Sequence, residues 1–118
     1  MRPKNYKGRC IKKKLNKCRE VAKLYDKLQI KYSELLEKDP EIKEISVNYL
    51  LQDLPDGEYT SDFVCVKNSG DYMVRECIYR KKLLLPRTCK LLDDSRLYWK
   101  KRGITDWGII IEKEPANE

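Results

Sequence analysis

The sequence predicts an α/β domain, and three observations lead to this class. Apolar residues recur at steps of three and four over residues 10–37, which indicates a helix. Three segments between residues 45 and 79 are rich in β-branched and aromatic residues and are separated by turn residues, which indicates strands. A second helical segment, 87–101, leads into an apolar run at 107–111. The predicted order is therefore a long N-terminal helix, a three-stranded meander, a helix and a closing strand.

The long N-terminal helix is predicted from a stripe of apolar positions that ends at a proline. Asp39 and Pro40 end the helix, because a residue that precedes proline disfavours helical backbone. The same spacing is compatible with two helices in near-continuity. The apolar positions are Ile11, Leu15, Cys18, Ala22, Tyr25, Leu28, Tyr32, Leu35 and Leu36.

The meander is predicted as strands at 45–51, 58–66 and 72–79. The turn residues PDG at 55–57 separate the first two strands, and NSGD at 68–71 separates the last two. Because the second turn is short, the last two strands are expected to form a hairpin.

The second helix and the closing strand complete the domain. Pro86 opens the helix and Gly103 caps its C-terminal end. The apolar run at 107–111 is expected in a buried central position of the sheet, as is typical of parallel strands. A right-handed crossover through helix 87–101 makes this strand parallel to the strand at 72–79.

Positive charge is concentrated at the N-terminus of a chain whose net charge is +7 over 118 residues. Residues 1–9 are predicted as an extended basic arm and residues 10–118 as a single domain. A one-sided basic block favours a polyanionic partner, nucleic acid before membrane, although a solvated helix end is the simpler alternative. The candidate nucleic-acid contacts in this block are Arg9, Lys12, Lys13, Lys14 and Lys17.

The composition argues against several classes of protein. No apolar run approaches the roughly 18 residues that cross a bilayer, and no apolar stretch follows the basic N-terminus as it does in a signal peptide. We therefore expect a soluble cytoplasmic protein without membrane contact. Five cysteines with no histidine argue against a disulfide framework, a zinc knuckle and His-activated thiol chemistry. Cys65 and Cys77 are expected to serve as small hydrophobes inside strands.

Two acids interrupt the predicted hairpin where a Thr or Val would be expected. Asp62 lies in the middle of one strand and Glu76 in the middle of the next, so the closed hairpin can bring their side chains together on one face of the sheet. Two carboxylates held close raise each other's pKa unless a cation lies between them. Mg²⁺ or Mn²⁺ is bound by one or two such carboxylates together with waters and substrate phosphate. The alternative is two exposed acids that pair with Arg75, Arg80 or a neighbouring lysine.

The segments around these acids resemble a known nuclease core. The sequence 59-YTSDF-63, followed by 74-VRECIYRKK-82, a helix and an apolar strand, resembles the PD-(D/E)xK nucleases. More narrowly, it is similar to the TnsA-like endonucleases of transposons, which have Y-x-PDF and V-x-E-x-K. The resemblance covers roughly residues 20–112. It implies a restriction-endonuclease-like core and a Mg²⁺- or Mn²⁺-dependent DNA endonuclease of a mobile element or phage, acting in a bacterial or phage-infected cell.

The resemblance also implies roles for particular residues. Asp62 and Glu76 correspond to catalytic residues that hold the metal ion. An acid from the helix before the sheet usually completes such a site, and Asp26 is the favoured one, although ordinary solvated helix acids are the alternative. The candidates are Asp26, Glu34 and Glu37, with Gln29 as a polar neighbour.

Two positions depart from the motif of the resembling nucleases. Ser61 stands in place of the proline, whose main effect is to shape the entry to the strand. Ile78 stands in place of the lysine, which would orient the attacking water and offset developing negative charge. Either a nearby cation replaces this lysine, with Arg80 and Lys82 preferred, or Ile78 packs against the long helix in an inactive site. The other cations that could replace the lysine are Lys81 and Lys90.

Three hypotheses of function follow. The first is a metal-dependent DNA endonuclease that hydrolyses phosphodiesters, with the basic arm on the DNA backbone. The second is a catalytically inactive DNA-binding or assembly module with the same fold. The third is a protein whose arm and long helix bind another protein of the transposition or phage machinery. Cations of the second helix are either phosphate contacts or a solvated face: Arg87, Lys90, Arg96, Lys100 and Lys101.

Overall fold

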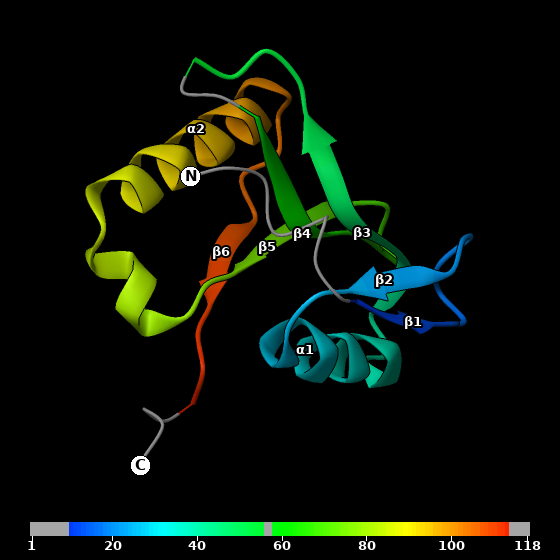
Figure 1. The fold of residues 1–118 in the computed structure, drawn as a ribbon. Coiled ribbons are helices and arrows are strands. Elements are labelled where there is room, and N and C mark those ends of the chain that lie inside the picture. The colour runs from blue at the N-terminus through cyan, green and yellow to red at the C-terminus, as the bar shows by residue number, and fades with distance from the viewer. Residues whose placement is uncertain (1–9, 56–57, 114–118) are drawn as a thin grey trace.

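The computed structural model describes residues 10–55 and 58–113, and it confirms the α/β class. A mixed four-stranded sheet lies between two helices, and a two-stranded hairpin precedes the first helix (Figure 1). Within these described residues, neither helix is long and apolar enough to span a bilayer. The elements are β1 (Ile11–Lys13), β2 (Ala22–Leu24), α1 (Lys27–Lys38), β3 (Ile42–Leu51), β4 (Tyr59–Lys67), β5 (Tyr72–Cys77), the 3₁₀ helix η1 (Arg80–Leu84), α2 (Pro86–Lys101) and β6 (Trp107–Ile110).

The helix predicted over residues 10–37 is wrong in its first half. Residues 11–24 contain the antiparallel hairpin β1–β2, in which Ile11 pairs with Leu24. Tertiary contacts override the helical spacing here, since the backbone N–H of Ile45 in β3 donates to the Lys17 carbonyl (2.9 Å) and ties the hairpin loop to the sheet. The helix begins only after Asp26, whose carboxylate caps it.

The sheet has the strand order β3-β4-β5-β6, and its connections are those that the sequence predicted. Strands β3, β4 and β5 form an antiparallel meander, and β5 pairs with β6 in parallel after the crossover through α2. The prediction that the closing strand is central is wrong, because β6 is the last strand of the order. Its apolar run has another cause: Ile110 packs against the cluster that contains α1, and Trp107 packs against the cluster that contains α2.

The core consists of two clusters, one on each face of the sheet. Phe63 and Cys65 of β4 belong to the cluster with α1, whereas Val64 between them belongs to the cluster with α2. This alternation is the period-two pattern of a strand that is covered on both faces. Cys65 and Cys77 are buried free thiols in the first cluster, which confirms their predicted role as small hydrophobes.

Candidate functional site

Asp62 and Glu76 lie side by side at the point where β4 and β5 stop pairing. The ladder between these strands ends at Phe63 and Arg75, one residue before the two acids. The side chains of Asp62 and Glu76 are fully buried. The two residues are joined directly, because the backbone N–H of Asp62 donates to Glu76 Oε1 (3.1 Å). The backbone N–H of Cys77 likewise donates to Asp62 Oδ2, so carboxylate oxygens bind N–H groups that a regular ladder would pair with carbonyls.

The pairing of β4 with β3 is also interrupted at Asp62. Val47 pairs with Phe63 and Tyr49 with Ser61, but Asn48 and Asp62 between them do not pair. Asn48 has a left-handed backbone (φ 55°), a conformation that asparagine tolerates better than most residues. Asp62 is therefore outside the regular pairing with both neighbouring strands, β3 and β5, and its side chain does not have to follow their alternation between the two faces of the sheet.

The two carboxylates reach different helices, whereas the sequence predicted both on one face of the sheet. Asp62 Oδ1 accepts a hydrogen bond from Gln29 Nε2 of α1 (2.8 Å). Glu76 Oε2 accepts one from Ser95 Oγ of α2 (2.6 Å). This correction follows from the interrupted ladders, because a regular register would place directly opposed residues on the same face.

Glu76 accepts hydrogen bonds from residues of two other elements, β4 and α2. Oε1 accepts from Tyr59 Oη (3.2 Å) and from the Asp62 backbone. Oε2 accepts from Ser61 Oγ (2.7 Å) and from Ser95 Oγ. Burying a carboxylate costs several kcal/mol unless donors of this kind replace its lost water. The short O–H···O distances are those of charge-assisted bonds.

Gln29 is the residue of α1 that reaches the acids, and sequence reasoning named it only as a polar neighbour. Its side chain is fully buried. Nε2 donates to Asp62 Oδ1 and to Asn48 Oδ1 (2.7 Å), while Oε1 accepts the backbone N–H of Tyr25 (2.9 Å). The amide is therefore fixed in one orientation. The signal that could have found it is its position next to Leu28 on the apolar stripe of the helix.

The three helix acids that were candidates for the metal site are used elsewhere. Asp26 accepts the backbone N–H of Gln29 (2.8 Å) as the N-cap of α1. Glu34 forms an ion pair with Lys13 (3.2 Å), and Glu37 accepts the backbone N–H groups of the loop before β2. The inward face of α1 is instead made by its buried residues Leu28, Gln29, Ser33 and Leu36. Across residues 10–55 and 58–113, no group of three or more Cys, Asp or Glu side chains is placed to hold a metal ion together.

The cations expected to replace the motif lysine lie on an exposed segment after β5. Arg80 is bonded to the chain that follows β6: its Nε and Nη2 donate to the carbonyls of Glu112 (3.1 Å) and Lys113 (2.9 Å). Lys82 in η1 is exposed. Ile78 is 3% exposed and packs in the cluster with α2, not against the N-terminal helix as the alternative had it.

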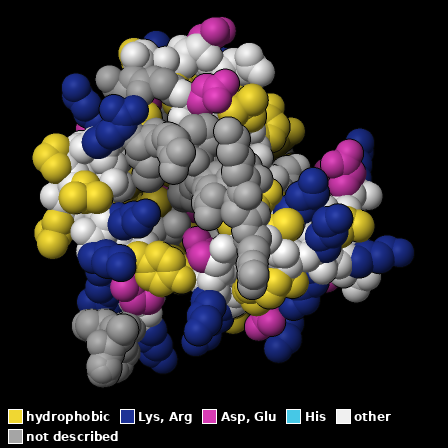
Figure 2. Space-filling model, in the orientation of Figure 1, with side chains coloured by type: hydrophobic (Ala, Val, Ile, Leu, Met, Phe, Trp, Pro, Cys, Tyr) yellow, Lys and Arg dark blue, Asp and Glu magenta, His cyan; other side chains and the backbone are white. Residues whose placement is uncertain are grey.

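The predicted nucleic-acid contacts divide into surface and structural residues. Lys12 and Lys14 are exposed at the β1–β2 hairpin, and Lys90 is exposed on α2. Lys17 is different, because its Nζ donates to the carbonyls of Leu36 (2.8 Å) and Asp39 (2.6 Å) at the C-terminal end of α1. Arg9 lies outside the described residues. On the face drawn in Figure 2, Lys and Arg side chains are spread over the surface and do not form one stripe.

A groove of about 590 Å³ opens beside this network, between the segment that contains β2 and strands β3 and β4. Asn48 and Thr60 line it, and Asn48 is the residue that binds Gln29. The groove wall has both charges, from Arg19 and Lys23 and from two glutamates, Glu20 and Glu58.

The site offers hard oxygen donors in a buried setting. The carboxylates of Asp62 and Glu76, with the amide oxygen of Asn48 nearby, are the ligand type that Mg²⁺ and Mn²⁺ prefer, so the donor chemistry fits such an ion.

Comparison with protein-family models gives no match for this chain, and comparison with curated proteins gives none either.

Proposed function

We propose that the chain is a metal-dependent DNA endonuclease domain of a mobile element or phage, with Asp62 and Glu76 at its centre. The main observation in support is that both acids are fully buried and lie next to each other where the β4–β5 ladder ends. Buried carboxylates are costly, and their concentration at one point of a fold is typical of functional sites. The motif resemblance around residues 59–63 and 74–82 supports the same class and a restriction-endonuclease-like core. The cytoplasm of a bacterial or phage-infected cell is the proposed location.

In this proposal Asp62 and Glu76 hold Mg²⁺ or Mn²⁺. Such an ion, when bound, neutralises charge on the scissile phosphate and lowers the pKa of a bound water. Gln29 orients Asp62 through its amide N–H. The exposed lysines of the β1–β2 hairpin contact the DNA backbone without reading its sequence.

A second candidate is a catalytically inactive DNA-binding or assembly module with this fold. It is favoured by Ile78, which is buried among apolar side chains where the resembling nucleases have lysine. Arg80 is bonded to the carbonyls of Glu112 and Lys113 instead of to the acids. This candidate keeps salt-dependent DNA binding, which requires only the basic surface.

Plasmid nicking in Mg²⁺ or Mn²⁺ separates the two candidates. If the chain is a nuclease, Asp62→Asn and Glu76→Gln each reduce the nicking rate by more than about 100-fold, since loss of metal-assisted stabilisation is worth several kcal/mol. Glu34→Gln is the matched control, because it makes the same change at an exposed helix acid. Absence of nicking by the unmodified chain, with DNA binding that both variants retain, would instead establish the inactive module.

A further inference from the structure

Both tryptophans of the chain donate a hydrogen bond to a serine hydroxyl that in turn contacts Glu76. Trp99 of α2 donates from Nε1 to Ser61 Oγ (3.0 Å), and Trp107 of β6 donates from Nε1 to Ser95 Oγ (3.1 Å). Trp99 is only 4% exposed. Two residues from different elements thus direct their only polar atoms into one small region of the interior.

The direction of each hydrogen bond follows from the chemistry of the groups. An indole N–H can only donate, so each serine oxygen accepts from a tryptophan and has its single hydrogen left to donate. That hydrogen goes to Glu76 Oε2, at 2.7 Å from Ser61 and 2.6 Å from Ser95. The two hydroxyls also lie 3.4 Å apart, but this contact is longer than either bond to the carboxylate and does not compete with it.

We infer that Ser61 and Ser95 are positioning residues for Glu76, and that Trp99 and Trp107 fix the direction of their hydroxyls. The two Trp–Ser–Glu76 chains join α2, β4 and β6 to one carboxylate oxygen of β5. The network holds that carboxylate in one orientation for the cation of the proposed site, and in this respect it rests on the proposed function.

The inference gives a reason for one departure from the nuclease motif. Ser61 stands where the resembling sequences have proline, and it is fully buried. A proline has no hydroxyl, so it could neither accept the indole N–H of Trp99 nor donate to Glu76. The serine therefore adds a bond to the carboxylate that the motif residue cannot make.

The network can be tested without any metal, by the two indole N–H resonances in ¹⁵N–¹H NMR spectra of the full chain. Glu76→Gln is expected to shift both resonances, and Ser95→Ala to shift that of Trp107 more than that of Trp99. Ser33→Ala is the matched control, because Ser33 is a buried serine whose hydroxyl donates to the Ile30 carbonyl. Indole resonances that do not respond to Glu76→Gln would overturn the inferred network.

The positioning role is tested by Mn²⁺ titration calorimetry on the same proteins. Loss of an outer hydrogen bond to a metal ligand weakens metal binding by about 10- to 100-fold, and we expect this for Ser95→Ala and for Ser61→Val. Ser61→Thr has nearly the same shape as Ser61→Val but keeps the hydroxyl, so it is expected to restore most of the affinity. Ser33→Ala is expected to bind Mn²⁺ as the unmodified chain does.

Two outcomes separate this inference from the proposed function. If Ser61→Val and Ser95→Ala bind Mn²⁺ as tightly as the unmodified chain, the serines do not position Glu76 for the cation. If the unmodified chain binds no Mn²⁺ while its indole resonances respond as expected, the proposed function fails and the network around Glu76 stands.

Discussion

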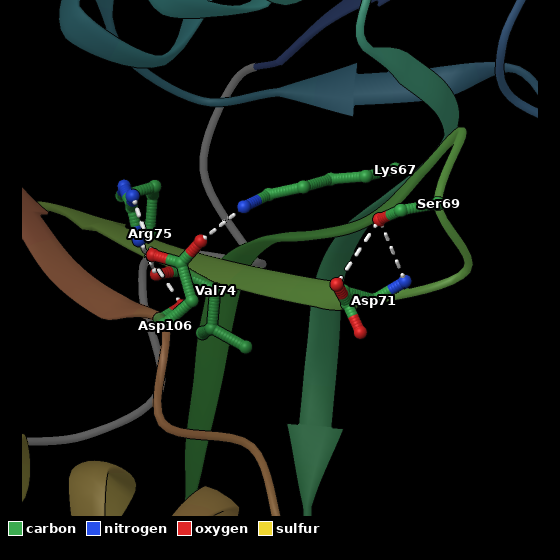
Figure 3. Close-up of polar contacts among 6 residues, drawn as sticks. All are labelled: Lys67, Ser69, Asp71, Val74, Arg75 and Asp106. Atoms are coloured by element: carbon green, nitrogen blue, oxygen red, sulfur yellow. Dashed lines mark hydrogen bonds and ion pairs between the residues drawn. The ribbon is translucent and has the colours of Figure 1, made fainter.

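Strand β5 carries two acid-binding networks of opposite character, one at the surface and one in the interior. At the surface, Asp106 before β6 binds two cations: Lys67 Nζ at 2.6 Å and Arg75 Nη2 at 2.8 Å (Figure 3). In the interior, Glu76 on the next residue of β5 is held by hydroxyl and backbone donors. Both networks connect the parallel pair β5–β6 to neighbouring elements.

The two networks differ in what their loss should cost. The side chain of Asp106 is 35% exposed, so water and salt can replace its partners. Glu76 is fully buried, so water cannot replace it as the acceptor for the groups that donate to it. The surface network contains the ion pairs, yet we expect it to contribute less to the free energy of unfolding than the buried network. The reason is that a hydrogen bond in the interior cannot be replaced by one to water.

The largest effect is expected from Glu76→Ala. It leaves the hydroxyls of Tyr59, Ser61 and Ser95 buried without their acceptor, which should lower the free energy of unfolding by about 3 kcal/mol or more. Urea denaturation followed by circular dichroism measures it. Glu44→Ala truncates an exposed acid of β3 and should change stability by less than about 0.5 kcal/mol. Equal losses in the two variants would contradict the assignment of Glu76 as a structural centre.

A smaller loss is expected from Gln29→Leu on the other face of the sheet. The substitution keeps the volume but removes the amide that binds Asp62, Asn48 and the Tyr25 backbone, so the free energy of unfolding should fall by about 2 kcal/mol. Urea denaturation again gives the value. Ser33→Ala, one turn further along α1, removes a single hydroxyl and serves as the control. A neutral or stabilising Gln29→Leu would mean that Asp62 finds other donors.

The smallest effect is expected at the surface network, and it depends on pH. A hydrogen bond from Lys67, helped by the hydrogen bond and charge of Arg75, lowers the pKa of Asp106 although desolvation opposes this. Because the pKa is lower in the folded state, Asp106 stabilises the fold above its unfolded pKa of about 4. This contribution is lost as the pH falls through the folded pKa.

Asp106→Asn should therefore remove part of the loss of stability below about pH 4 and have a smaller effect at neutral pH than either buried substitution. Thermal unfolding from pH 2 to pH 7 measures the difference. Asp71→Asn is the control, since Asp71 is an exposed acid whose carboxylate accepts a hydrogen bond from the hydroxyl of Ser69 (3.1 Å; Figure 3). If Asp106→Asn lost stability below pH 4 as steeply as the unmodified chain, the ion pairs of Asp106 would not stabilise the fold.

Much of the sheet could be predicted because its signals are local. The turn residues at 68–71 and the alternation on either side of them define the β4–β5 hairpin, and the crossover connection through α2 makes β6 parallel to β5. The acids Asp62 and Glu76 were recognised because carboxylates are rare inside strands of this composition. Their adjacency follows from the hairpin register.

The sequence by itself thus determined the α/β class, the meander β3–β4–β5, the parallel pairing of β6 with β5 and the closeness of Asp62 and Glu76 on neighbouring strands. Only the tertiary structure decided that residues 11–24 form a hairpin, that the acids reach different helices and that Gln29 and Ser95 bind them. The physical reason is range. Turn chemistry and periodicity act over a few neighbouring residues, whereas the direction of a side chain at an interrupted ladder depends on donors that are far away in the sequence.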